Sequence, residues 1–203
     1  EAGGVIGFIG VLLALTQGAW APDIISGLVI LNGEIVGEGD MIEFEDSNGK
    51  RILGTIYRTK VFHTEILDPV HNHRIMLQNS RLRGMTIRNL SKFASARGLR
   101  EAISFNIGYD VPASRVREMI ADAFRQLQES GNRRLEYQHE PQICVTRAGD
   151  YAIEWTLYYY TKDLRSLLQT RQEVTLAVIE SAARQAISLA TPVILHSQSS
   201  ITV

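Results

Sequence analysis

The sequence predicts an α plus β membrane protein in which a kinked apolar helix is followed by a small all-β unit and then by an α+β unit. Three observations predict this fold class. Residues 2–22 form an uncharged segment, and its length is about that of a helix that spans a bilayer. The hydrophobic period changes to two residues after about residue 36, and strands alternate with helices after about residue 100. The chain has 203 residues, of which 45% are hydrophobic and 21% charged, as is ordinary for a folded protein.

Small residues form one stripe along the first helix. Gly3, Gly7, Gly10, Ala14 and Gly18 follow one another at steps of three or four residues. Each glycine destabilises a soluble helix by roughly 0.8 to 1 kcal/mol relative to alanine, so the stripe needs a compensating reason. In a membrane, small residues allow neighbouring helices to pack closely. A buried soluble helix is the alternative, but it explains the bulky residues of this segment and not the stripe.

The first helix is expected to kink where Gly18 and Pro22 lie close together. A proline inside a helix removes a backbone hydrogen bond and bends the chain. Residues 23–31 are apolar again and are expected to form a second helical piece at an angle to the first, ending at Asn32-Gly33.

The next segment, up to about residue 90, has the alternation of short strands. Ile42 and Phe44 alternate with Glu43 and Glu45 ahead of a turn at 47–49. Further strands are expected at 52–58, 61–67, 74–78 and 85–90. Five short strands within about 55 residues predict a compact all-β unit.

A second unit combines strands with two helices. Apolar residues at helical spacing predict its first helix, namely Val116, Met119, Ile120, Ala123, Phe124 and Leu127. The other expected elements are a strand at 103–109, strands at 142–147 and 151–160, and a helix at 163–188. The order β-α-β-β-α predicts a split α+β domain. The tail from Pro192 to Val203 is expected to be extended and too short to fold alone.

Charge is distributed unevenly, although the formal net charge is only -1. Residues 1–49 contain eight acids and no Lys or Arg, whereas residues 69–100 contain seven bases and no acid. Two oppositely charged, solvated faces that attract each other explain this pattern, and a nucleic-acid-binding surface is the alternative.

Cysteine and histidine usage favours neither a disulfide framework nor a metal site. The single cysteine, Cys144, is expected to be a small core residue. His63, His71 and His73 suggest a metal site with Asp68, but His71 and His73 fall in a predicted turn and are expected to be solvated. The sequence contains no phosphate-binding loop, nucleophile elbow or supported Ser/His/Asp set, so we expect no enzyme, no metal and no cofactor.

An ordered series of local motifs follows the same order of parts. These motifs are residues 23–31, Gly39 to Phe44, Gly54 to Ile56, Thr64 with Ile66, Ile75 to Ser80, Ile87 to Ser91, Gly108 to Asp110, and Leu189 to Pro192. In this series the sequence resembles the small-conductance mechanosensitive channel (MscS-like) family over nearly its whole length. It departs from the family at Gln78, where a proline is common, and at Glu38, where an arginine is usual.

The resemblance implies a homoheptamer in the cell (inner) membrane, multi-pass, with further helices upstream and with its β and α+β domains in the cytoplasm. It assigns a pore-lining transmembrane helix to residues 1–33, an Sm-like β-barrel domain to 34–96, a ferredoxin-like α+β domain to 97–191, and a C-terminal strand of an oligomeric β-barrel to 192–203. Such a channel opens under membrane tension and releases ions and small osmolytes during hypo-osmotic shock. Its partners are membrane lipids and further copies of the chain, and no nucleic acid is expected.

The pore helix then contains the candidate functional residues. One register directs Val11 and Leu15 toward the axis as an apolar seal, with ordinary helix packing as their alternative role. Gly18 and Pro22 form the hinge, and Gly3, Gly7, Gly10 and Ala14 the helix-packing stripe. Two other functions remain open: a soluble, oligomeric Sm-like nucleic-acid-binding protein that uses the basic run and Phe93, and a non-conducting membrane scaffold.

Overall fold

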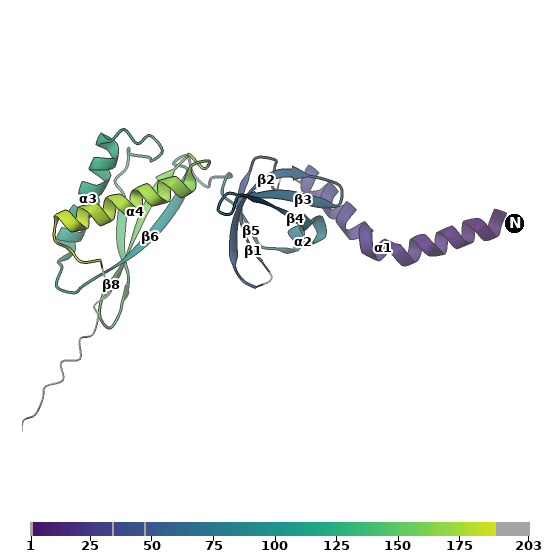
Figure 1. The fold of residues 1–203 in the computed structure, drawn as a ribbon, viewed down its shortest axis with the longest axis horizontal. Coiled ribbons are helices and arrows are strands. Elements are labelled where there is room, and N and C mark those ends of the chain that lie inside the picture. Colours follow the sequence, from purple (N-terminus) through teal and green to yellow (C-terminus); the bar gives the residue numbers. More distant parts are fainter. Residues whose placement is uncertain (1, 34, 47, 190–203) are drawn as a thin grey trace, which may run out of the picture. The chain divides into compact units, whose positions relative to one another are not determined.

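A computed structural model describes residues 2–33, 35–46 and 48–189, which belong to two compact units, Glu1–Lys92 and Phe93–Val203 (Figure 1). Each unit has a hydrophobic core of its own. The predicted terminal strand at 192–203 lies outside the described residues.

The first unit begins with α1 (Ala2–Asn32), a helix with a sharp bend. The arms Gly3–Gly18 and Trp20–Asn32 meet at 62° (Figure 1). Pro22 explains the bend, because it cannot donate the hydrogen bond that would reach the carbonyl of Gly18 four residues earlier. The helix ends at Asn32, whose side-chain amide donates to the Leu28 carbonyl at 2.7 Å.

Five antiparallel strands follow in the first unit. They are β1 (Met41–Glu45), β2 (Arg51–Thr59), β3 (His63–Asp68), β4 (His73–Gln78) and β5 (Ile87–Asn89). Their order in the sheet is β4-β3-β2-β1-β5. Alternation places Ile42, Phe44, Ile56 and Ile66 in a core that Ile30 of α1 completes. The five predicted strands are therefore present, although the last is shorter than expected.

A short helix that the sequence analysis did not predict, α2 (Asn79–Gly84), connects β4 to β5. Asn79 starts it with a fully buried side chain, whose amide donates to the carbonyls of Lys60 at 2.8 Å and Val61 at 2.9 Å. The Thr64 hydroxyl donates to the Asn79 side-chain oxygen at 2.9 Å. Six residues make fewer than two turns, so the sequence carries no helical period that could reveal α2.

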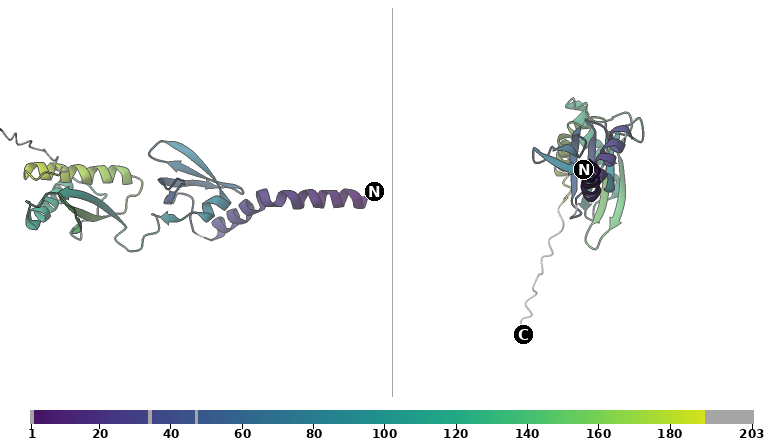
Figure 2. Two further views of the ribbon diagram at one scale, coloured as in Figure 1. Left: turned by 90° about the horizontal axis from the view of Figure 1, so that it is seen from below. Right: turned by 90° about the vertical axis from the view of Figure 1, so that its right-hand side faces the viewer.

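The second unit contains β6 (Leu99–Ile107), α3 (Ala113–Glu129), β7 (Gln142–Ala148), β8 (Ile153–Thr161) and α4 (Leu167–Arg184). The sheet is antiparallel with the order β6-β8-β7. The two helices pack together and cover one face of the sheet (Figure 2). All six apolar residues predicted for the core face of α3 are buried, so this helix and its orientation are confirmed.

Two details of the second unit differ from expectation. Cys144 is exposed rather than part of the core, because β7 is an edge strand and most of its residues face solvent. The last helix is shorter at both ends than the predicted 163–188. It ends when Ala186 adopts a left-handed φ of 52° and the Ile187 N–H bonds the Ala182 carbonyl at 2.9 Å.

Candidate functional site: a bent apolar helix and its anchor

The first arm of α1 is apolar and fully exposed. Every residue from Gly3 to Gly18 is exposed, including Leu15 at 80% and Ile6 at 70%. A contiguous apolar surface of this kind marks a site of contact with other protein or with lipid. Among the described residues no straight helix combines the length and apolarity of a membrane span, whereas the two bent arms of α1 taken together do.

The residues predicted for the seal and for helix packing all lie on this first arm. Val11 and Leu15 are one turn apart and exposed. A Cβ atom added at Gly3, Gly7 or Gly10 would meet nothing within 4 Å in this chain, and Ala14 is exposed. Both roles need neighbours outside the described part of the chain, so they stay predictions.

Gly18 and Pro22 flank the bend and are exposed. Their exposure beside the bend is compatible with the hinge predicted for them.

The second arm of α1 is attached firmly to the rest of the unit. Its buried residues Asp23, Ser26, Gly27 and Ile30 recur at helical spacing and form one face that packs on α2. Asp23 Oδ1 accepts two hydrogen bonds from Ser80, at 2.9 Å from the backbone N–H and at 2.5 Å from the hydroxyl. Asp23 is the only ionisable residue between positions 2 and 33. This isolated charge in an apolar segment was the one feature of the sequence that could have indicated the anchor.

Gly27 allows the second arm to approach the sheet closely. A Cβ atom added there would lie 2.5 Å from Asn79 Nδ2 and 2.6 Å from the Val61 carbonyl oxygen. These are the same two groups that Asn79 joins by its own hydrogen bond. Glycine is therefore required for packing at this position, unlike the glycines of the first arm.

Together these contacts make α1 a helix with one fixed arm and one arm that is exposed within the described part of the chain. Asp23, Gly27, Asn79 and Ser80 hold the fixed arm, and the bend separates it from the apolar arm. A force applied to the apolar arm would therefore reach the β-strands through this anchor.

The charged residues do not form two simple faces. Arg88 pairs with Glu43 at 3.0 Å, as the attraction of the acidic and basic segments predicts. Arg74 instead lies 4.4 Å from the centre of the Tyr57 ring and 3.4 Å from Glu65. The seven bases of residues 69–100 are also divided between the two units, with Arg97 and Arg100 in the second.

Lys60 strengthens the same charge cluster, with its amine 2.5 Å from Glu65 Oε1. The hydrogen bond from Lys60 lowers the pKa of Glu65, although burial of the carboxylate opposes this. Arg74 and Arg88 of the basic run are thus paired with acids of the same sheet, which makes that run a weaker candidate for a nucleic-acid surface.

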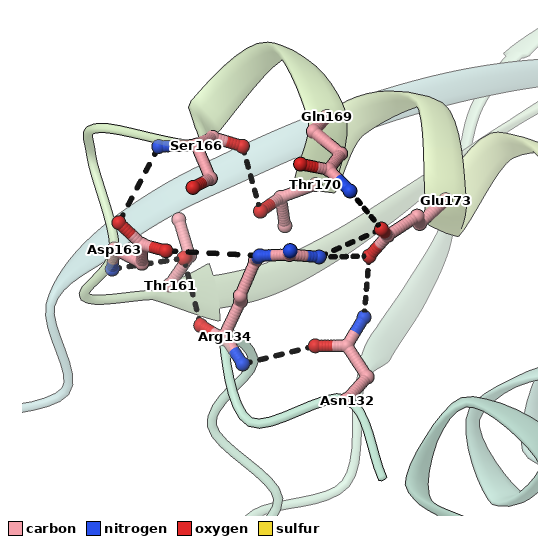
Figure 3. Close-up of polar contacts among 8 residues, drawn as sticks. All are labelled: Asn132, Arg134, Thr161, Asp163, Ser166, Gln169, Thr170 and Glu173. Carbon is pink, nitrogen blue, oxygen red and sulfur yellow. Dashed lines mark hydrogen bonds and ion pairs between the residues drawn. The ribbon is translucent and has the colours of Figure 1, made fainter. Parts of the chain in front are cut away.

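In the second unit a polar network braces α4 against the loop after α3 (Figure 3). Glu173 of α4 accepts hydrogen bonds from Arg134 at 2.7 and 2.8 Å, from Asn132 at 2.7 Å and from Gln169 at 2.9 Å. The Thr161 hydroxyl of β8 donates to the Arg134 carbonyl at 2.8 Å. Arg134 Nη1 donates to both carboxylate oxygens of Glu173, and the other donors to that carboxylate also belong to the protein. We therefore interpret the network as structural.

The second unit also contains the residues that match a known protein family. Residues 101–189 match the model of the family described as "Mechanosensitive ion channel MscS, C-terminal". This match supports an MscS-like family for the chain. No curated protein sequence matches it.

Solved structures extend the MscS-like fold to the rest of the chain. The closed-state crystal structure of Helicobacter pylori MscS has a TM-score of 0.67 and 17% identity, covering 94% of this chain and 70% of that one. Two cryo-EM structures of Arabidopsis thaliana MSL1 have TM-scores of 0.54 and 0.57, each at 20% identity. These matches cover 93% and 92% of this chain, and 65% and 62% of the MSL1 chains. The MscS-like α plus β fold is thus established, and the family is one of channels rather than enzymes.

Proposed function

We propose that this chain is the subunit of an ion channel that membrane tension opens, and that the channel releases ions and small osmolytes during hypo-osmotic shock. The observation that carries the proposal is the exposed apolar arm of α1, which is joined through a 62° bend to an arm anchored on a folded unit. The MscS-like fold of the chain supports the same proposal.

In this mechanism the apolar arms of several subunits line one pore. When tension is low, the arms pack through Gly3, Gly7, Gly10 and Ala14, and rings of Val11 and Leu15 exclude water. Tension favours the conformation with the larger area in the membrane plane and so shifts a two-state equilibrium toward the open pore. The bend at Gly18 and Pro22 absorbs the change in angle, while Asp23 and Ser80 keep the second arm in place.

The proposal extends to assembly and location. The functional parts are a pore helix at 1–33, a β-domain at 34–96, an α+β domain at 97–191 and a barrel-forming strand at 192–203. Copies of the chain form a homo-oligomer, which we propose to be a heptamer. The protein is a multi-pass protein of the cell (inner) membrane that contacts lipid, with the β and α+β domains in the cytoplasm.

Osmotic release from liposomes tests this function. Liposomes that contain the full-length protein and a self-quenching dye are diluted into hypo-osmotic or iso-osmotic buffer. A tension-gated channel releases dye only after the hypo-osmotic dilution, and at a downshift that protein-free liposomes survive. A non-conducting scaffold would leave the two kinds of liposome indistinguishable.

A further inference from the structure

The turn between β3 and β4 brings three metal-ligating side chains together. Asp68 ends β3, His73 begins β4, and these two residues are directly paired across the strands. His71 lies in the loop between them. One ligand atom of each residue lies within 4.8 Å of the ligand atoms of the other two. Asp68 Oδ2 is 2.9 Å from His71 Nδ1 and 4.0 Å from His73 Nε2.

The backbone of the turn holds the Asp68 carboxylate in a fixed orientation. Its Oδ1 atom accepts hydrogen bonds from the N–H groups of Val70 at 2.7 Å and His71 at 3.0 Å. The Asn72 N–H bonds the Asp68 carbonyl at 3.0 Å, and Asn72 adopts the left-handed φ of 53° that closes the loop. Oδ1 is thus committed to the turn, whereas Oδ2 faces the two imidazoles.

We propose that Asp68, His71 and His73 bind one divalent transition-metal ion, such as zinc, through Oδ2, Nδ1 and Nε2. Two imidazoles and a carboxylate form a donor set that zinc and its first-row neighbours prefer over magnesium or calcium. Ligand atoms about 2.0 to 2.2 Å from a tetrahedral ion lie roughly 3.3 to 3.6 Å apart. The observed separations of 2.9 and 4.0 Å lie on either side of this value.

Small rotations of the histidine rings would complete the site. The side chains of His71 and His73 are 56% and 55% exposed, whereas that of Asp68 is 7% exposed. Asp68 is therefore a preorganised ligand, and the two histidines can adjust. Three protein ligands leave the fourth position of a tetrahedral ion open to water. When the ion binds, the proton between His71 Nδ1 and Asp68 is released to solvent or taken up by Nε2 of the same ring, and the Nδ1 lone pair becomes a ligand.

The neighbouring charges do not oppose a cation at this place. Arg74 follows His73 in β4, so its side chain lies on the opposite face of the strand, where it contacts Glu65 and Tyr57. His63 lies at the far end of β3, where its Nε2 is 3.7 Å from Glu65. His71 and His73 are exposed, as the predicted turn implies, and the pairing across the strands places His73 beside Asp68.

Metal titration of the full-length protein in detergent tests the site. The protein is prepared without a polyhistidine tag, treated with a chelator, and titrated with zinc chloride in a calorimeter. We expect one zinc ion per chain, and we expect His71→Ala and His73→Ala each to raise the Kd at least about tenfold. His139→Ala is the matched control, because His139 is exposed and pairs with Glu136 outside the cluster. Its Kd should equal that of the wild type.

Cobalt provides an independent readout of the ligands. Co²⁺ in a tetrahedral site absorbs visible light strongly, so the wild type and His139→Ala should develop these bands and the double variant His71→Ala/His73→Ala should not. Thermal melting without metal identifies any variant that fails to fold. If His73→Ala fails to fold, His73→Gln is titrated in its place. The proposal is wrong if the wild type shows no saturable binding, or if the double variant binds zinc with an unchanged Kd. Neither result depends on whether the protein conducts ions.

Discussion

The carboxylate of Asp23 accepts both the backbone N–H and the hydroxyl of Ser80, a residue 57 positions later in the chain. This contact joins the arm of α1 beyond the bend to the start of α2. It is the polar part of an anchor whose apolar part is Ile30 in the core of the first unit.

Loss of the Asp23 carboxylate should loosen this anchor. Asp23→Ala leaves the Ser80 N–H and hydroxyl without their acceptor, whereas Ser80→Ala removes only the hydroxyl donor. We therefore expect Asp23→Ala to lower the melting temperature of the purified protein more than Ser80→Ala does. Equal melting temperatures for Asp23→Ala and the wild type would show that the contact does not hold the helix.

A side chain at position 27 should push the second arm away from the sheet. In Gly27→Ala, the added Cβ meets the Val61 backbone carbonyl, which cannot rotate away. Overpacking of this kind destabilises by about 1 to 3 kcal/mol, more than the gain in helix propensity from alanine. Gly84→Ala in α2 is the matched control, because the space at Gly84 is open. Chemical denaturation should show a loss of stability for Gly27→Ala alone.

The stability of the second unit should depend on the ionised form of Asp122. Hydrogen bonds from Arg184 at 2.9 Å and Ser181 at 2.8 Å hold the pKa of Asp122 below its ordinary value of 3.8. The stabilisation is therefore present above that value and is lost as the pH falls through the lowered pKa. We expect Asp122→Asn to melt below the wild type near pH 7, and the difference to shrink as the pH falls below 3.8 and the Asp122 carboxylate becomes protonated. Exposed Asp150→Asn should not differ from the wild type near pH 7 or in acid.

A polar side chain in the proposed seal should make the closed pore leak. Leu15→Asn places an amide where a ring of apolar side chains excludes water, so it favours a wetted pore without tension. We expect a larger current at zero suction in liposome patches. Leu13→Asn, which lies on another face of the helix, should leak less. An unchanged resting current in Leu15→Asn would remove Leu15 from the seal.

The parts of the fold that depend on local periodicity were predictable. The strands β1 to β4 and the core face of α3 follow from alternation and from helical spacing, because each buries one face of its own segment. The prediction of a core position for Cys144 was wrong, because the exposure of β7 depends on the strand order β6-β8-β7, which no local pattern encodes. The short helix α2 was not predicted, because six residues are too few to show a helical hydrophobic period.

The candidate site was predictable only in part. Gly18 and Pro22 mark the bend through their own backbone chemistry, which is local. The anchor joins Asp23 to Ser80 and Gly27 to Asn79 across more than 50 residues, so only the isolated charge of Asp23 hinted at it. The roles of Val11 and Leu15 depend on surfaces outside this chain, and neither the sequence nor one subunit can determine them.

Patch-clamp recording of the full-length protein in liposomes, with suction raised stepwise, tests most directly whether membrane tension opens a channel. We predict unitary currents that are rare at rest and whose open probability rises steeply with tension, before the tension at which protein-free patches rupture. Silence up to rupture, with the protein demonstrably inserted and folded, would contradict the channel mechanism and favour a non-conducting scaffold of the same fold.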